Sequence, residues 1–227
     1  MRVTSYNIRK AVGLDWRRDA WRIVDVLAEI DADVVVLQEA DKRLGSREGV
    51  LPLDVMETDL GLTLCDVSVR PLSHGWHGNA IFVKPDLQDH STARIDVPSI
   101  DPRGAVSAHF HGPNIEVIGA HLGLTPGTRR RQMGALDEVL KSRTHPVMLA
   151  GDFNEWNKRR VQFPNASDIV FPGHSFHASR PVSSLDLFVL SGGVEARSSF
   201  VHRSDLARRA SDHLPVVIDI AISERRP

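Results

Sequence analysis

The sequence has almost no cysteine, no long apolar run and almost no net charge. Cys65 is the only cysteine in 227 residues, which excludes an intramolecular disulfide and a cysteine-rich zinc site. No segment reaches the ~18 consecutive apolar residues that a transmembrane helix requires, and the N-terminus lacks the apolar core of a signal peptide. We therefore expect a cytoplasmic protein without a transmembrane segment.

The charge balance excludes a strong general attraction to polyanions. Lysine and arginine total 28 against 29 acidic residues, a formal net charge of −1. Local basic runs remain at residues 129–131 and 158–160, where solvated helix faces and loops are the expected setting. A hydrophobic fraction of 41% is sufficient for a packed core. No linker or repeat interrupts the chain, and we expect one monomeric domain over residues 1–227.

Apolar runs and amphipathic segments alternate along the chain. Strands are expected at residues 2–8, 34–37, 62–69, 79–83, 105–110, 115–120, 147–150, 185–190 and 214–222, and helices at 19–30, 53–60 and 125–140. The order strand, helix, strand occurs twice. Because these strands are apolar enough to need cover on both faces, we predict two sheets packed face to face with helices outside, a layered α/β sandwich.

Polar side chains with catalytic chemistry fall at the ends of the expected strands. They are Asn7, Glu39, His121, Asp152, Asn154, Asp212 and His213. If these ends meet at one rim, the rim combines hard oxygen ligands with imidazoles. Such a donor set suits Mg²⁺ or Mn²⁺, which bind phosphate oxygens directly. The pattern therefore points to phosphoryl transfer.

Six short motifs occur in a recognisable order over nearly the whole chain. They are Ser5–Ile8, Asp33–Glu39, Gly119–Leu122, Gly151–Asn154, Leu185–Asp186 and Ser211–Pro215. In this order and spacing the sequence resembles the endonuclease/exonuclease/phosphatase family of metal-dependent phosphoester hydrolases, which includes pancreatic deoxyribonuclease. The resemblance implies a four-layered α/β/β/α sandwich, with two mixed, mostly antiparallel sheets packed face to face and helices outside.

The same resemblance implies a divalent metal site and a set of catalytic groups. Glu39 would be the principal ligand of Mg²⁺ or Mn²⁺, helped by Asn7 and Asp212. The remaining motif residues would act on the water and on the developing charge.

Five of these residues would carry the chemistry. Asp152 would orient or deprotonate the attacking water, and Asn154 would hold that water or a phosphoryl oxygen. His213 would donate to the developing negative charge, with its ring held and kept protonated by Asp186. His121 would be a second donor or the general acid for the leaving oxygen. Asp152 and His213 are both expected at a solvent-facing rim.

Two further positions resemble family residues beside the substrate phosphate. Asn79 and Arg103 are therefore candidate substrate-binding residues, with a structural role in a loop or at a strand start as the alternative. Asp41, Lys42 and Arg43 follow Glu39 closely; a solvated loop is the simpler expectation, with contact to substrate as the alternative.

The expected activity is metal-dependent phosphodiester hydrolysis, with nucleic acid as the leading substrate. Alternatives are a phospholipase C or sphingomyelinase-like activity on a lipid headgroup, a phosphomonoesterase, and a non-catalytic phosphate-binding module. A lipid substrate predicts an exposed apolar patch around Trp16, Trp76 or Trp156. A nucleic acid predicts a continuous basic groove through residues 129–131 and 158–160.

Overall fold

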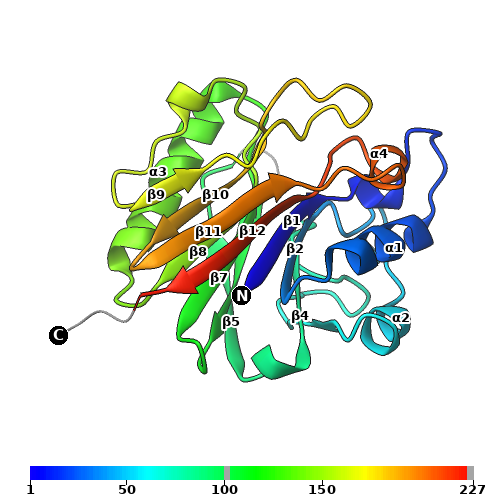
Figure 1. Ribbon diagram of the computed structural model, residues 1–227, viewed down its shortest axis with the longest axis horizontal. Coiled ribbons are helices and arrows are strands. Elements are labelled where there is room, and N and C mark those ends of the chain that lie inside the picture. Colours follow the sequence, from blue (N-terminus) through cyan, green and yellow to red (C-terminus); the bar gives the residue numbers. More distant parts are fainter. Residues whose placement is uncertain (100–102, 224–227) are drawn as a thin grey trace.

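Two six-stranded sheets pack face to face in the computed structural model, which describes residues 1–99 and 103–223 (Figure 1). The first sheet contains, in spatial order, β11 (Val194–Val201), β12 (Val216–Ile222), β1 (Arg2–Asn7), β2 (Val34–Gln38), β4 (Ala80–Val83) and β3 (Thr63–Leu64). The second contains β5 (His90–Asp96), β6 (Gly104–Phe110), β7 (Ile115–His121), β8 (Val147–Asp152), β10 (Asp186–Ser191) and β9 (Asp168–Val170). This arrangement confirms the predicted pair of mixed sheets.

Helices cover the outer face of each sheet and complete the predicted four layers (Figure 1). The helices α1 (Ala20–Ile30), α2 (Leu53–Thr58) and α4 (Ala207–Ala210) pack on the first sheet, and α3 (Pro126–Ser142) packs on the second. Short 3₁₀ turns are η1 (Arg9–Ala11), η2 (Pro85–Leu87) and η3 (Lys158–Arg160). None of the helices in the described ranges is long and apolar enough to cross a membrane.

Local sequence signals explain where the two longest helices begin and end. The Asp19 carboxylate accepts a hydrogen bond from the Trp21 amide at the start of α1, and Asp31 ends that helix in the left-handed conformation at φ 48°. Thr125 caps α3 in the same way, with Pro126 in its first turn. Each of these helices connects two neighbouring parallel strands, β1 with β2 and β7 with β8. The other described pairings are antiparallel.

The core between the sheets is rich in β-branched side chains. Val34 and Val36 of the first sheet meet Val106 and Met148 of the second, all fully buried. Gly119 lies at this interface, where an added Cβ would approach the Val36 side chain to 2.6 Å. The two sheets are therefore held in close and specific contact, which fixes the relation between their strand ends.

Three strands were not predicted from the sequence, and one predicted strand is longer than the observed one. The expected strand at residues 62–69 shortens to β3, and β5, β9 and β11 were not expected. Strands β5 and β11 lie at sheet edges, and most of their side chains are exposed. A strand with little buried surface has no apolar alternation for a sequence pattern to detect.

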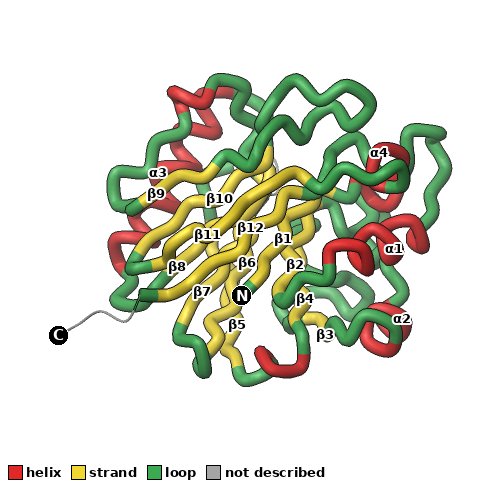
Figure 2. The backbone as a smooth tube through the Cα atoms, viewed as in Figure 1, coloured by secondary structure: helices red, strands yellow, loops and turns green. Residues whose placement is uncertain are grey.

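The strand ends that carry the motif residues meet at one rim. The parallel strands β1 and β2 end together at Asn7 and Gln38, and β7 and β8 end together at His121 and Asp152. The antiparallel strand β10 begins at Asp186, directly opposite Asp152. Figure 2 shows long loops beyond these ends, including the segments that lead from β1 to α1 and from β9 to β10. The rim is therefore surrounded by loops from distant parts of the sequence.

Candidate active site

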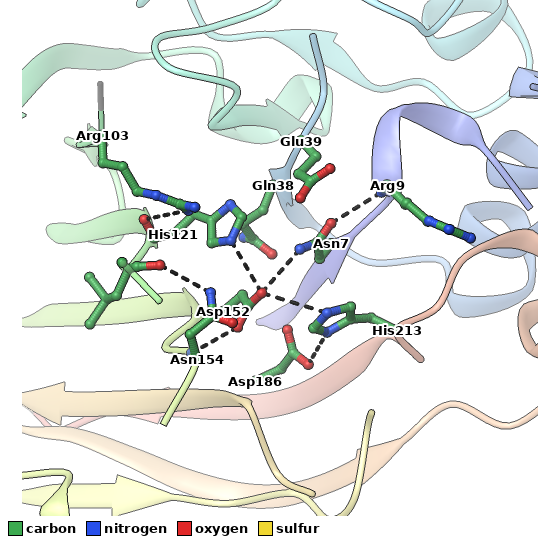
Figure 3. Close-up of polar contacts among 12 residues, drawn as sticks. Asn7, Arg9, Gln38, Glu39, Arg103, His121, Asp152, Asn154, Asp186 and His213 are labelled. Carbon is green, nitrogen blue, oxygen red and sulfur yellow. Dashed lines mark hydrogen bonds and ion pairs between the residues drawn. The ribbon is translucent and has the colours of Figure 1, made fainter. Parts of the chain in front are cut away.

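The carboxylate of Asp152 is the centre of a hydrogen-bonded cluster (Figure 3). Its Oδ2 atom accepts a hydrogen bond of 3.0 Å from Asn7 Nδ2 and lies 3.4 Å from His121 Nε2 and 3.6 Å from His213 Nε2. Its Oδ1 atom accepts the backbone N–H of Asn154 at 2.9 Å. The structure thus brings together five residues that the sequence placed at four strand ends.

The position of Asp152 follows from the close contact between strands β7 and β8. A Cβ atom added at Gly151 would lie 1.9 Å from the carbonyl oxygen of Ala120, so only glycine permits this approach. The register then places His121 opposite Asp152, and Asp152 opposite Asp186 on the next strand. Three polar side chains therefore lie side by side at the ends of three adjacent strands.

His213 lies between two carboxylates. Its Nδ1 atom is 2.8 Å from Asp186 Oδ2, which also accepts a hydrogen bond of 2.5 Å from Ser175 Oγ. Burial lowers the pKa of His213, but the carboxylates of Asp186 and Asp152 outweigh it and raise that pKa to about 9. At neutral pH the ring is therefore a cation and both of its nitrogens are donors.

His121 contacts the same Asp152 carboxylate, but its ring is neutral. Burial lowers the pKa of His121 to about 3, because the Asp152 charge only partly offsets the loss of solvent and the positive charges of Arg103 and His213 add to the effect. Its imidazole is neutral throughout the physiological range. Two histidines that share one carboxylate in opposite protonation states are suited to different parts of an acid–base reaction.

The cluster is more enclosed than expected. Only 1% of Asp152 and 5% of His213 is exposed, so the prediction of a solvent-facing rim is wrong for these two side chains. The loop before β10 accounts for the difference, since the Phe176 ring lies 4.9 Å from the His213 ring, centroid to centroid. Burial strengthens the electrostatic interactions within the cluster.

Glu39 lies at the end of β2, beside the cluster and in a half-buried position. Its backbone adopts a left-handed conformation with φ 55°, and its carboxylate accepts a hydrogen bond from the ammonium group of Lys10. The approach of Lys10 shows that this carboxylate attracts a cation. No motif in the sequence analysis included Lys10, although its charge lies only three positions after Asn7.

The two other expected metal ligands are on neighbouring segments. The Asn7 amide oxygen accepts the backbone N–H of Arg9 at 3.1 Å, and Asp212 pairs with the Arg9 guanidinium at 3.5 Å. Ser211 donates a hydrogen bond of 2.7 Å to the Asn7 carbonyl, which fixes the segment that carries Asp212 against the end of β1. Asn7 thus contacts both the Asp152 cluster and the segment of Asp212.

The chemistry of these donors fits a hard divalent cation. Glu39, Asn7 and Asp212 offer carboxylate and amide oxygens, the ligands that Mg²⁺ and Mn²⁺ prefer. A second grouping consists of Asp152, Asp186 and His213, whose ligand atoms lie within 4.8 Å of one another. In that grouping a protonated imidazole already lies between the carboxylates, so it is suited to orient His213 rather than to bind a metal ion.

The two candidate substrate-binding residues have different environments. Asn79 is buried, and its Nδ2 donates to the carbonyl of Gly104 at 2.9 Å, while its Oδ1 has no partner in the described part of the chain. Arg103 donates to the carbonyl of His121 at 3.4 Å and lines a pocket beside Glu39. Asn79 therefore connects β4 to β6, whereas Arg103 lies at the wall of the pocket.

Some residues around the site gave little or no signal in the sequence. Ser175 and Phe176, which contact Asp186 and His213, belong to a stretch without periodicity or motif. Lys42 and Arg43 lie in a largely exposed loop, as expected, and also line the pocket beside Glu39. Their proximity to Glu39 in the sequence was the available signal.

The sequence and the fold have counterparts in known proteins. The chain is 26% identical to the uncharacterised protein YbhP of Escherichia coli over 223 residues, which cover 86% of both chains. It is similar in structure to Danio rerio TDP2 complexed with a single-stranded DNA product, with a TM-score of 0.73, 16% identity and coverage of 97% and 98% of the two chains.

A second solved structure with the same fold is the mannosyl-6-phosphatase of Bacteroides thetaiotaomicron. The TM-score is 0.70, the identity is 20%, and the comparison covers 98% of this chain and 100% of the other. The sequence model of the Endonuclease/Exonuclease/phosphatase family matches residues 4–213, a range that contains every residue of the site described above. The chain therefore belongs to the endonuclease/exonuclease/phosphatase family.

Proposed function

We propose that this protein is a divalent-metal-dependent phosphodiester hydrolase in which water attacks phosphorus in line with the leaving oxygen. The observation that carries the proposal is the bond between Asn7 and Asp152, which places a carboxylate with four polar neighbours beside Glu39. Hydrolysis of a phosphodiester needs a positioned water, neutralised phosphoryl oxygens and a stabilised leaving oxygen. The site offers a group for each need.

Asp152 is the residue proposed to orient and deprotonate the water. Asn7, Asn154 and the two histidines hold its carboxylate in one orientation, so the position of a bound water would be fixed as well. The Asn154 side chain donates to the carbonyl of Leu122 at 3.0 Å, which keeps its amide oxygen available to accept a hydrogen bond from that water. The fixed Asp152 carboxylate and the Asn154 amide oxygen would together orient the attacking water.

His213 and His121 are proposed to act on the phosphate. The protonated His213, held by Asp186, would donate to a phosphoryl oxygen as negative charge develops. His121 is neutral, so it would act as a hydrogen-bond donor near the leaving oxygen rather than as an imidazolium acid. When bound by Glu39, Asn7 and Asp212, Mg²⁺ or Mn²⁺ would neutralise charge on the phosphate oxygens.

Observations on the substrate point in two directions. The similarity to TDP2 with its DNA product supports nucleic acid. Against it, Arg129 is buried and paired with Glu155 at 3.0 Å, so the first basic run does not present three arginines to a groove. Trp16 and Trp156 are 77% and 61% exposed, as a lipid-headgroup substrate would require, whereas Trp76 is half-buried; a lipid headgroup is the second candidate.

One panel of substrates tests the proposal. A model diester, a model monoester, plasmid DNA and phospholipid vesicles are incubated with Mg²⁺ or Mn²⁺, and in parallel with EDTA. We expect hydrolysis of the diester that EDTA abolishes and that Asp152→Asn lowers strongly. Turnover of the monoester alone would support a phosphomonoesterase, as in the similar mannosyl-6-phosphatase. No turnover in the whole panel would identify a non-catalytic phosphate-binding protein.

A further inference from the structure

A pocket of about 240 Å³ opens beside Glu39 and His121. Its walls are the loop after β2, from Asp41 to Arg47, and the loop before β4, from Val69 to Gly78. His121 lies on the edge of this pocket and 3.4 Å from Asp152, so the pocket adjoins the proposed site of phosphorus chemistry. A group attached to the reacting phosphate would reach it directly.

The lining of this pocket is strongly basic. Six cationic side chains face two carboxylates, and the cations are Lys10, Lys42, Arg43, Arg47, Arg70 and Arg103. Neither carboxylate forms an ion pair with Arg43, Arg47 or Arg70. Glu39 already binds Lys10, and Asp41 accepts hydrogen bonds from Ser73 Oγ at 2.6 Å and from the His74 amide at 2.8 Å.

Three of the arginines have no carboxylate partner among the described residues. Lys42 pairs with Glu48 at 2.5 Å, but the ion pairs within residues 1–99 and 103–223 do not include Arg43, Arg47 or Arg70. The Arg70 guanidinium instead donates to the Gly45 carbonyl at 3.5 Å, which brings the two loops together. Uncompensated guanidinium groups that share a small pocket repel one another, and an anion would relieve that repulsion.

The pKa of His77 responds to the same positive charges. Burial lowers the pKa of His77, and the charges of Arg47 and Arg70 lower it further against the opposing effect of Asp96. The Nδ1 atom of His77 is buried and has no hydrogen-bond partner in the described part of the chain. The pocket therefore also contains a neutral imidazole with unused hydrogen-bonding capacity.

We propose that this pocket is a second anion subsite, which binds a further phosphate group of the substrate next to the phosphate that is hydrolysed. The inference rests on the proposed function and adds a substrate class, namely compact phosphodiesters that carry a second phosphate. Guanidinium groups suit this ligand because their planar N–H groups bind phosphate oxygens in pairs. The volume of about 240 Å³ lies just below the range of drug-sized ligand pockets, which starts at about 300 Å³, and suits one phosphate with its linking atoms.

Another charged pocket does not extend this subsite into a binding groove for a nucleic-acid chain. It lies along α3, where Arg130, Arg159 and Arg160 alternate with carboxylates of Asp137, Glu138 and Glu155. Mixed charge of this kind gives no continuous attraction for a polyanionic chain. The observations therefore favour a compact substrate over a polynucleotide.

Two chromogenic diesters that differ by one phosphate test the proposal. They are thymidine 5′-(p-nitrophenyl phosphate) and the same compound with a 3′-phosphate. We expect the added phosphate to raise kcat/KM of the wild-type protein about tenfold, mainly through KM, as for one charge-assisted contact. In Arg47→Gln and Arg70→Gln the gain should shrink, and in the double variant it should vanish. Arg131→Gln, an exposed change on α3, is the matched control and should retain the full gain.

A binding measurement separates the subsite from turnover. Isothermal titration calorimetry compares thymidine 3′,5′-bisphosphate with thymidine 5′-phosphate on the same variants. Tighter binding of the bisphosphate by the wild-type protein, absent in the double variant, would support the subsite even if neither diester is hydrolysed. The lack of hydrolysis would then refute only the proposed function. Hydrolysis of both diesters with equal kcat/KM, and equal binding of the two nucleotides, would overturn the inference while the proposed function stands.

A longer substrate tests the preference for compact molecules. The p-nitrophenyl ester of tetrathymidylate extends the chain beyond the single added phosphate. We expect no further gain in kcat/KM. A second tenfold gain would show that the pocket is the start of a nucleic-acid track, which would contradict the compact-substrate class.

Discussion

The side-chain amide of Asn7 donates a hydrogen bond of 3.0 Å to the carboxylate of Asp152, across 145 residues of sequence. Asn7 ends a strand of the first sheet and Asp152 ends a strand of the second, so this bond joins the rims of the two sheets. The candidate site is therefore complete only when the sheets have packed against each other. Catalytic geometry and global packing depend on the same contact surface.

Asp152→Asn should lower kcat by about 10²- to 10⁴-fold, the usual contribution of a general acid or base. The amide has nearly the shape of the carboxylate but cannot take a proton from water. Steady-state hydrolysis of a model diester with Mn²⁺ measures the effect.

Asp137→Asn is the matched control. Asp137 is also a buried carboxylate, and among the described residues its hydrogen bonds come from Asn165, away from the site. Thermal unfolding of both variants shows whether either change acts through stability. Near wild-type turnover in Asp152→Asn would refute the role of Asp152.

Activity should decline at alkaline pH as His213 loses its proton. Because Asp186 and Asp152 raise the pKa of His213 to about 9, the donating cation is present below that pH and disappears above it. The stability that this group contributes has the same sign: it is fully present below the ordinary histidine pKa near 6.5 and is lost as the pH rises through about 9.

Asp186→Asn should move the alkaline limb of the pH–kcat profile to lower pH, since it removes the carboxylate that contacts His213 Nδ1. An NMR titration of the His213 ring follows the same shift without turnover. Asp168→Asn, an exposed change on β9, should leave the profile in place. An alkaline limb that does not respond to Asp186→Asn would assign that limb to another group.

Removal of divalent metal should abolish hydrolysis, and Mg²⁺ or Mn²⁺ should restore it. Glu39→Gln is expected to weaken Mn²⁺ binding about 10- to 100-fold, because the amide loses the charge that holds a hard cation. Calorimetric titration with Mn²⁺ measures this directly. Glu57→Gln, on the exposed face of α2, is the control, and equal Mn²⁺ affinity in the two variants would exclude Glu39 as the principal ligand.

Gly151→Ala should destabilise the fold by roughly 3 kcal/mol or more, as severe overpacking does. The added Cβ would lie 1.9 Å from the backbone of Ala120, which belongs to a central strand and cannot move freely. Gly134→Ala on α3 meets no atom within 4 Å and should stabilise the helix instead, by about 0.5–1 kcal/mol. Urea denaturation distinguishes the two outcomes, and equal stability of both variants would contradict the close contact between β7 and β8.

The sequence alone determined the layered sandwich and the residues at its rim. Buried strands such as β2 and β8 are continuous apolar runs, and the amphipathic segments of α1 and α3 have marked ends, so both kinds of element follow from local pattern. The exposed strands β5 and β11 have no such pattern and become strands only because a neighbour offers backbone hydrogen bonds.

Only the tertiary structure determined the protonation states and the electrostatic potential at the rim. That His213 is charged while His121 is neutral depends on burial and on the carboxylates that each ring meets, and these carboxylates come from other strands. The same holds for Arg47 and Arg70, whose charges act together only because two loops close one pocket. Protonation and electrostatic potential depend on distances through space and on exclusion of solvent, and a linear sequence encodes neither until the chain has folded.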